Sequence, residues 1–488
     1  MRIKIHEQLA LRPELPVIIG NIDYKNFKEL LIEIDELLIK SGIEENFVEE
    51  QLVKRNKFFG VENQERFQKR CRVALRCNIV RWLTEKEYRP FSRRLADSPL
   101  LQWFCLIDRM DKIRVPSKSE LFRFDKMVRA QEIKKIMDEL NQYVLRKSNP
   151  LRLKEELDLE AYFSDTCCLQ AHIHFPVDWV LLRDGVRTII KALEVIRKYG
   201  IRLRMPKPSS FLSTINKLSI EMTQSRRTKN AKKRRKKTLR KMKKIVKTVR
   251  EHALRYKEKL EKNWEESNLT EAQKNQIIKR LKNVIDQMPE AMRQAHERII
   301  GARKVINKDK ILSLYEPDIH VIVRGKMNAE IEFGNTLFLA EQSKGLIIDW
   351  QLEKEQSIGD IALMQNSLEH IKEVFGVYPK NVGGDRGFWS QENDEWLRAQ
   401  KIYNGISPKK PGELKRKIKK SRFRKLQKRR AQTEPRISII KNYFLKSPLK
   451  SKGFEYRELS VAWAILAHNL WLLAGLPKQK IKRLKKAA

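Results

Sequence analysis

The stretch Tyr378-Pro-Lys-Asn-Val-Gly-Gly-Asp-Arg-Gly-Phe-Trp-Ser-Gln-Glu-Asn393 decides the fold that we predict for this chain. Its first part predicts a short strand over residues 381–384 that ends in an acidic residue, Asp385. A turn at Arg386-Gly387 follows, and a helix then begins near Ser390, a residue type favoured at helix N-caps. An aspartate at the end of a strand, beside glycines that let a ligand approach the backbone, is typical of a metal or phosphate site. The alternative is an ordinary acidic turn after an edge strand.

The composition of the chain points to a polyanionic partner. The 488 residues predict two or three domains. The formal net charge is +43, a self-repulsion that a soluble protein tolerates best when an anionic partner offsets it. Nucleic acid is the leading candidate and an anionic membrane surface is the second. Aromatic residues make up 8% of the chain, which argues against wholesale disorder.

Cysteine usage and hydropathy predict a cytoplasmic protein. The five cysteines are odd in number and form no CxxC pair, as expected for reduced, buried thiols. The first six residues lack an uninterrupted apolar core, so we expect no secretory signal. The most apolar run, residues 459–476, contains His468 and Asn469 and is short for a membrane span. We predict that this run is a buried helix and that no membrane is involved.

The first 150 residues carry the apolar spacing of helices. Residues 26–40 form a clear amphipathic pattern that Ser41-Gly42 ends. Further helices are predicted over residues 44–54, 64–83, 87–95, 100–109 and 119–145. Strand-like alternation is lacking in this part of the sequence. We therefore predict an all-helical N-terminal domain over residues 1–150 that binds DNA, mediates dimerisation, or does both.

Strand patterns begin at about residue 157 and return after a long interruption. Residues 157–168 predict a strand with Asp165 near its end, and an extended segment and a helix over 179–199 follow. Later strands are predicted over residues 310–314, 336–340, 345–350, 381–384 and 403–407, with a helix over 360–375. His172 and His174 alternate along the extended segment, and two partly exposed side chains are favoured over a metal pair. The strands on both sides of the interruption predict one divided α/β domain.

The interruption is a basic helical segment. Residues 226–250 contain fifteen Lys or Arg and no acid, interleaved with apolar residues at helical spacing. The alternative is a solvated charge run, but so uniform a block repels itself in isolation, which favours binding to phosphate backbones. The DNA-binding candidates in this segment are Lys232, Lys233, Arg234, Arg235, Lys236 and Lys237.

A second basic block, residues 409–430, precedes the end of the α/β domain. It contains thirteen Lys or Arg against one acid, and its DNA-binding candidates are Arg422, Arg424 and Lys425. Pro435 is tolerated in a first helical turn, so a helix restarts or kinks at residues 433–434. Glu434 and Lys441 are two helical turns apart and are predicted to share a face. A helix over residues 456–473 closes the core, and a basic tail follows.

Three acids emerge as candidate ligands: Asp165, Asp385 and Glu434. Neighbouring strand ends bring such residues together, and carboxylates that converge would repel each other unless they held cations. Mg²⁺ prefers oxygen ligands, and two ions about 4 Å apart stabilise the attacking and leaving oxygens of an in-line phosphoryl transfer. Nearby cations would hold DNA phosphates, with Arg386, Arg430 and Lys441 as the candidates. Spacing alone does not single out this trio among 61 acids.

Four blocks in order along the chain resemble insertion-sequence transposases of the DDE type from bacteria. The first is Asp165-Thr followed by Ala171-His-Ile-His-Phe-Pro-Val-Asp178 and Leu181-Leu-Arg-Asp-Gly-Val-Arg187. The next comprises Ser313-Leu-Tyr-Glu-Pro-Asp318, Arg324-Gly-Lys326 and Glu332-Phe-Gly334. The third block resembles the family's second-aspartate block and reads Gly384-Asp-Arg-Gly-Phe-Trp-Ser-Gln-Glu-Asn393. Arg430, Glu434 and Lys441 resemble the Arg, Glu and Lys of the family's late Tyr-Arg-Glu-Lys signature. Gln427 occupies the position of its Tyr. The resemblance covers residues 85–475.

This resemblance implies a ribonuclease H-like catalytic fold in which Asp165, Asp385 and Glu434 are the catalytic and metal-binding residues. It implies two Mg²⁺ ions, with Mn²⁺ as an alternative, and no organic cofactor. The implied activity is binding of the element's terminal inverted repeats, cleavage at its ends, and joining of 3′-hydroxyls to target DNA. A homodimer on DNA, in the bacterial cytoplasm and nucleoid, is implied with it. Pro435 directly after Glu434 and the substitution at Gln427 keep Glu413 and Glu458 open as alternatives to Glu434. They also keep open a nuclease without strand transfer and a catalytically dead DNA-binding relative.

The predicted organisation has five parts. They are the helical N-terminal domain (1–150), the first part of the catalytic domain (151–205), the basic helical insertion (206–302), the second part of the catalytic domain (303–476) and a basic tail (477–488).

Overall fold

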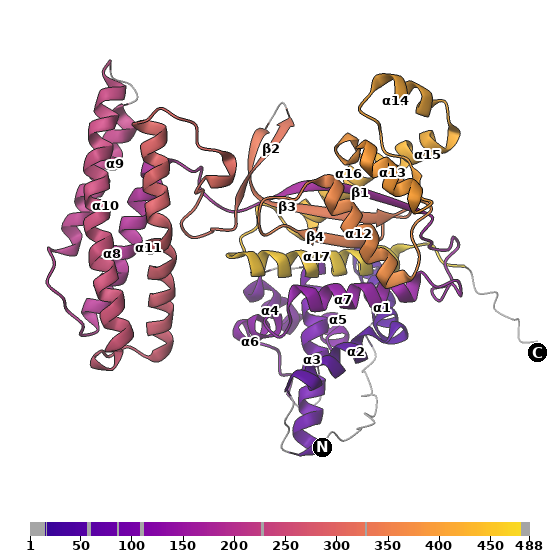
Figure 1. Ribbon diagram of the computed structural model, residues 1–488. Helices are drawn as coiled ribbons and strands as arrows, with labels where there is room; N and C mark the ends of the chain where they lie inside the picture. Colours follow the sequence, from indigo (N-terminus) through magenta and orange to yellow (C-terminus); the bar gives the residue numbers. More distant parts are fainter. Residues whose placement is uncertain are drawn as a thin grey trace, which may run out of the picture.

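The computed structural model places a mixed sheet between helices, with a separate helical bundle to one side (Figure 1). It describes residues 15, 17–55, 60–84, 87–107, 112–225, 229–326 and 329–479. Most of the predicted tail, residues 480–488, lies outside these residues, as do the first residues of the chain.

Seven helices precede the first strand in the described part of the chain. Their bounds are Ile22–Ser41 (α1), Ile43–Arg55 (α2), Val61–Leu83 (α3), Tyr88–Asp97 (α4), Pro99–Phe104 (α5), Lys118–Asp125 (α6) and Ala130–Val144 (α7). Gly42 ends α1 in the left-handed conformation, as predicted. The single helix predicted over 119–145 is wrong, because residues 126–129 separate α6 from α7. Glu132 starts α7 anew by accepting a hydrogen bond from the Arg129 backbone at 3.0 Å.

Six strands form one sheet. Their bounds are Ala161–Gln170 (β1), His320–Lys326 (β2), Ala329–Gln342 (β3), Ile347–Leu352 (β4), Asn381–Gly383 (β5) and Tyr403–Asn404 (β6). The order is β2-β3-β1-β5-β6, and β4 also pairs with β3. β3 runs antiparallel to β1, β2 and β4, whereas β5 and β6 run parallel to β1. The hairpin and the strand at 381–384 are confirmed. The strand predicted over 310–314 is wrong, and Asp165 lies in the middle of β1 rather than at its end.

One long helix, Phe454–Gly475 (α17), lies between the sheet and the N-terminal helices (Figure 1). It packs against α1, α3, α7 and β4. By length and composition α17 could cross a membrane, but 72% of its most apolar window is buried inside the structure. The prediction of a buried helix is therefore confirmed. Residues of α1–α7, α17 and the sheet share one hydrophobic core, so the N-terminal helices do not have a core of their own.

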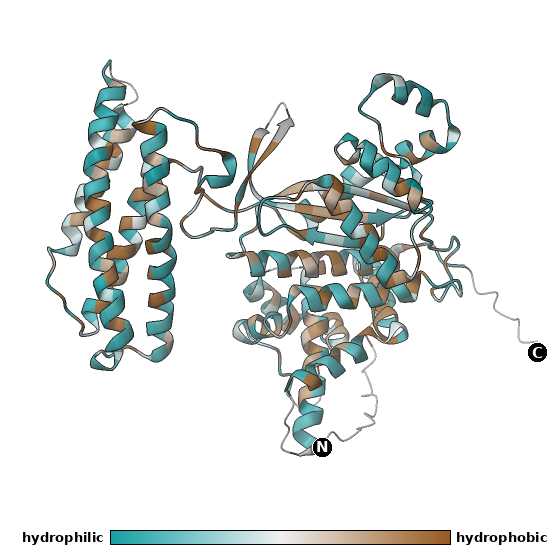
Figure 2. Cartoon of the chain, viewed as in Figure 1, coloured by the Kyte–Doolittle hydropathy of each residue, from teal (hydrophilic) through white to brown (hydrophobic). Residues whose placement is uncertain are grey.

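Four helices form the bundle: Asp178–Lys198 (α8), Pro208–Gln224 (α9), Ala231–Lys262 (α10) and Glu271–Ile299 (α11). Hydrophilic and hydrophobic segments alternate along these helices (Figure 2). The buried side chains form a second hydrophobic core that is separate from the first. α8 belongs to this core, although the sequence division placed it with the catalytic domain, because its apolar stripe faces α9–α11 rather than the sheet.

The remaining helices follow β4 and surround the end of the sheet. Their bounds are Asp360–Phe375 (α12), Gln391–Ala399 (α13), Pro411–Ile418 (α14), Ser421–Arg430 (α15) and Thr433–Ser438 (α16). Four short turns complete the elements: Trp264–Glu266 (η2), Asn307–Asp309 (η3), Arg386–Phe388 (η4) and the π-helical Ile439–Phe444 (η5). Ser390 caps α13 by accepting a hydrogen bond of 3.0 Å from Asn393, as predicted.

Candidate active site

The pairing of β1 with β5 brings Asp165 and Asp385 to the same level of the sheet. The two strands are parallel, and Phe163 lies opposite Gly383. Asp165 and Asp385 each come two residues after this last pair, Asp165 within β1 and Asp385 just beyond β5. The close approach needs the glycine, because a Cβ on Gly383 would lie 2.7 Å from the ring of Phe163. The sequence pattern had placed both acids at strand ends, and the parallel pairing supplies their proximity.

Backbone amides orient both aspartates. Asp165 Oδ1 accepts a hydrogen bond of 2.8 Å from the amide of Thr166, and Asp385 Oδ1 accepts one of 2.7 Å from the amide of Gly387. Both aspartates are half-buried, whereas Arg386 and Gly387 are exposed. The turn that follows Asp385 is the short helix η4, which replaces the simple turn predicted there. Each carboxylate is thus oriented by a backbone amide close to it in the chain.

The corner between α15 and α16 covers the face of the sheet that carries Asp165. Phe163 and Glu341 are paired across β1 and β3, so their side chains share one face, and Asp165, two residues after Phe163, lies on that face as well. Arg429 of α15 stacks 4.8 Å above the ring of Phe163, and α16 packs against β1. Glu434 lies exposed in the first turn of α16. The third predicted acid therefore comes from a helix over the same face.

Glu434 and Lys441, which were predicted to share a helical face, lie in two elements of different geometry. The chain leaves α-helical geometry at Ile439 and continues as the π-helix η5, which contains Lys441. A π-helix takes more residues per turn than an α-helix, so the seven-residue spacing does not by itself determine the relative direction of the two side chains. Pro435 lies in the first turn of α16, as predicted.

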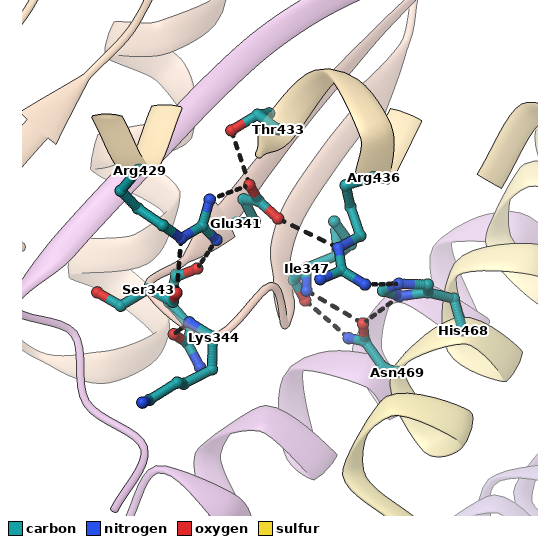
Figure 3. A network of polar contacts seen from close by, with 10 residues as sticks. Glu341, Ser343, Lys344, Ile347, Arg429, Thr433, Arg436, His468 and Asn469 are labelled. Atoms are coloured by element: carbon teal, nitrogen blue, oxygen red, sulfur yellow. Dashed lines mark hydrogen bonds and ion pairs between the residues drawn. The ribbon is translucent and has the colours of Figure 1, made fainter. Parts of the chain in front are cut away.

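A buried glutamate that the sequence analysis missed holds this corner in place (Figure 3). Glu341 is 1% exposed. Its Oε1 accepts hydrogen bonds of 2.9 Å from Arg429 and 2.7 Å from the hydroxyl of Thr433, and its Oε2 lies 3.5 Å from Nε of Arg436. The signal in the sequence was an acid that directly follows the apolar strand pattern of residues 336–340. Burial of a charged group requires such hydrogen-bonding partners.

A second acid that the sequence did not single out lies across β1 from α16. Asp360 begins α12, and its Oδ1 accepts a hydrogen bond of 3.0 Å from Thr166 Oγ1. A Cβ on Gly387 would lie 2.5 Å from Oδ2 of Asp360 and 3.0 Å from Oδ1 of Asp385. Asp360 therefore approaches both aspartate segments. No local pattern distinguishes it from other acids in first helical turns.

The basic candidates of the bundle divide into exposed and packed side chains. Lys232, Lys233, Arg234 and Lys237 are exposed on the first turns of α10. Arg235 and Lys236 are half-buried, and Arg235 stacks 5.0 Å from the ring of Trp179. The apolar residues that follow in α10, among them Met242, Val246 and Val249, are buried in the bundle core. The exposed group forms a basic surface at one end of α10, and Arg235 serves partly to pack α10 against α8.

The basic DNA-binding candidates of α15 also differ in their roles. Arg424 and Lys425 are exposed on α15, and Arg430 is half-buried at its end. Arg422 instead donates a hydrogen bond of 2.6 Å to Asn381 and stacks 4.2 Å from the ring of Tyr403, so it ties α15 to the sheet. Gln427, in the Tyr position of the late signature, donates a bond of 2.6 Å to the Gly405 carbonyl.

The candidate acids do not form a coordination shell in the described part of the chain. Among the described residues, no group of three or more His, Cys, Asp or Glu side chains is arranged to hold a metal ion. His172 and His174 are exposed, as favoured from the sequence, and line a cavity of about 300 Å³ between the bundle and the sheet. That cavity does not include Asp165, Asp385 or Glu434 among its lining residues.

Comparison with known proteins yields one match. Residues 335–470 match a family model described as a transposase DDE domain. The matched segment runs from β3 to α17 and includes Glu341, Asp360, Asp385 and Glu434, whereas Asp165 precedes it. No curated protein and no solved structure matches the chain.

Proposed function

From the premise that the chain is a DDE-type transposase, which its transposase DDE domain supports, we propose that it cleaves DNA at the ends of its own element and joins those ends to target DNA. The observation that carries this proposal is the parallel pairing of β1, which contains Asp165, with β5, which Asp385 follows, together with Glu434 on the helix that packs against β1.

The proposed catalytic fold is ribonuclease H-like. Its support is the path β4-β3-β1-β5-β6, in which β3 runs antiparallel to β4 and β1, and β5 and β6 run parallel to β1. The bundle α8–α11 enters this domain between β1 and β2. The proposed domains keep the order predicted from the sequence. The helical insertion now begins at about residue 178, because α8 belongs to the hydrophobic core of the bundle.

The residues present fit a divalent cation that prefers oxygen ligands. Asp165 and Asp385 each accept a hydrogen bond from a backbone amide, which orients a carboxylate at the site, and Glu434 is exposed. Exposed Gly387 leaves room beside Asp385 for a DNA backbone. Asp165, Asp385 and Glu434 would hold two Mg²⁺ ions, or Mn²⁺, which when bound activate the attacking oxygen and stabilise the leaving one.

The reaction is two phosphoryl transfers at the same acids. In the first, water attacks a phosphodiester at the element end, the P–O3′ bond breaks, and a 3′-hydroxyl and a 5′-phosphate are released. In the second, that 3′-hydroxyl attacks a target phosphodiester, forming a new P–O bond and freeing a 3′-hydroxyl of the target. Arg386 and Arg430 would hold the phosphate and offset its growing charge, with Lys441 of η5 as a third candidate.

The basic surfaces would bind duplex DNA on either side of the acids. Lys232, Lys233, Arg234 and Lys237 of α10 provide one contact with the phosphate backbone, and Arg424 and Lys425 of α15 provide another. Transposition needs two element ends held together, so we propose a homodimer on DNA.

Purified protein incubated with Mg²⁺ and DNA that carries the two ends of its element tests the proposal. Joined products are expected. Cleavage without joining would replace the proposal with a metal-dependent nuclease, and binding without cleavage would replace it with a non-catalytic DNA-binding protein. Omission of the metal in a parallel reaction is expected to abolish cleavage and to leave DNA binding in place.

A further inference from the structure

We propose that Glu341 is a positioning residue that holds Glu434 over the sheet at Asp165. This inference rests on the proposed function, because it assigns a role toward a catalytic glutamate. It adds a buried anchor on β3 to the three acids that carry the chemistry.

The contacts of Glu341 bracket Glu434. Its three partners are Arg429, Thr433 and Arg436, which lie before, next to and after Glu434 (Figure 3). The hydroxyl of Thr433 is the closest of these to Glu434 in the chain and is itself buried. One carboxylate on a central strand therefore fixes the end of α15 and the start of α16 together.

Both arginines extend this anchor to other elements. Arg429 also donates to the carbonyls of Ser343 at 2.6 Å and Gln342 at 3.0 Å, in the turn that joins β3 to β4. Arg436 lies 3.4 Å from His468 of α17, and a Cβ on Gly345 would overlap its guanidinium. Burial, together with Arg436, lowers the pKa of His468 to about 3, so this imidazole is neutral and adds no charge at physiological pH.

The corner depends on such an anchor for a physical reason. α16 has six residues and runs into a π-helix, so its own backbone hydrogen bonds give it little independent stability. A catalytic carboxylate must be held within a fraction of an ångström of its working position, and a displacement of 1 Å is enough to reduce a rate about 100-fold. The buried pairs at Glu341 supply that rigidity where the helix does not.

The test compares Glu341→Gln and Thr433→Val with wild type and with Asp125→Asn. Asp125 is a matched control, because it is a buried carboxylate bonded to Arg81 at 2.7 Å within the N-terminal helices, away from the candidate site. Thr433→Val removes only the hydroxyl bond and keeps the charge of Glu341, so it reports on the anchor if Glu341→Gln does not fold. Three quantities are measured: the single-turnover cleavage rate with Mg²⁺, the dissociation constant for element-end DNA, and backbone hydrogen exchange.

We expect both test variants to cleave more slowly, by about 10- to 100-fold for Glu341→Gln, with unchanged DNA affinity and faster exchange confined to residues 429–438. Asp125→Asn is expected to keep the wild-type rate below its unfolding temperature. Faster exchange at 429–438 with a wild-type cleavage rate would overturn the inference, as would faster exchange throughout the chain. Wild-type protein that fails to cleave at all would instead refute the proposed function, and the exchange data would still report whether Glu341 anchors the corner.

Discussion

Thr166, the residue after Asp165, donates a hydrogen bond of 3.0 Å from its hydroxyl to Oδ1 of Asp360. Oδ2 of the same aspartate points toward Gly387, which in turn donates its amide to Asp385. Asp360 therefore links the two segments that carry the aspartates of the candidate site, from the first turn of α12.

Asp360→Asn tests the importance of this link. An asparagine keeps an oxygen that accepts from Thr166 but removes the negative charge near Asp385. We expect a higher Mg²⁺ concentration for half-maximal cleavage and a loss of stability below about 1 kcal/mol, from the missing charge at a helix N-terminus. Glu392→Gln, an exposed acid in the first turn of α13, is the matched control. An identical Mg²⁺ dependence in the two variants would argue against a role for Asp360.

Gly345→Ala should destabilise the protein through Arg436. Gly345 has φ +90°, a conformation that side-chain-bearing residues rarely adopt, and the new Cβ would overlap the arginine guanidinium. We expect a loss of about 1–3 kcal/mol in the free energy of unfolding, measured with urea. Gly412→Ala is the control, because nothing lies within 4 Å of its Cβ position. An equal effect at both glycines would contradict the tight packing at Arg436.

The contact between α12 and α7 should depend on pH. His370 of α12 lies 3.2 Å from Asp138 of α7, and this bond raises the pKa of His370, while burial raises the pKa of Asp138. Asp349 of β4 and Lys134 of α7 face the same imidazole. A raised histidine pKa gives stabilisation that is present below the ordinary value of about 6.5 and is lost as the pH rises through the folded-state value.

The quantity to measure is the difference in unfolding free energy between wild type and His370→Gln. It should be largest below the ordinary histidine pKa of about 6.5, where the histidine is charged, and it should shrink as the pH rises through the raised pKa of His370. A difference that grows with pH would show that the histidine is held in its neutral form.

The basic surface of α10 should set the salt dependence of DNA binding. Each phosphate contact contributes about 0.9 to the slope of log affinity against log salt concentration. Replacing Lys232, Lys233 and Lys237 by glutamine is expected to lower that slope by up to about 2.7, which is three such contacts. The control replaces Lys279, Arg280 and Lys282, exposed on α11, and removes the same charge from the same bundle. Equal slopes for both triple variants would exclude a specific contact at α10.

The sequence predicts what local patterns determine. The helices of the N-terminal part, the hairpin of β3 and β4, the strand before Asp385 and the cap at Ser390 follow from spacing and turn chemistry alone. The basic helix α10 follows from its apolar residues at helical spacing. These features depend on residues that are neighbours along the chain.

What the sequence does not predict depends on contacts between distant segments. The parallel pairing of β1, which carries Asp165, with β5, which precedes Asp385, joins segments that are separated in the chain by the whole bundle. Glu341 and Asp360 acquire their partners only in the folded chain, so no local pattern marks them. α8 has an apolar stripe whichever core it joins, and the π-helix at Ile439 shifts Lys441 without a signal in the spacing.

The cleavage activity of Asp385→Asn tests the central claim most directly. Asparagine keeps the shape of the side chain and an oxygen that accepts from the Gly387 amide, but it removes the charge that a divalent cation requires. With Mg²⁺ and DNA that carries the element ends, we expect no cleavage, while the affinity for that DNA stays the same or rises because a repulsive charge is lost. Cleavage at the wild-type rate by this variant would contradict the assignment of the site.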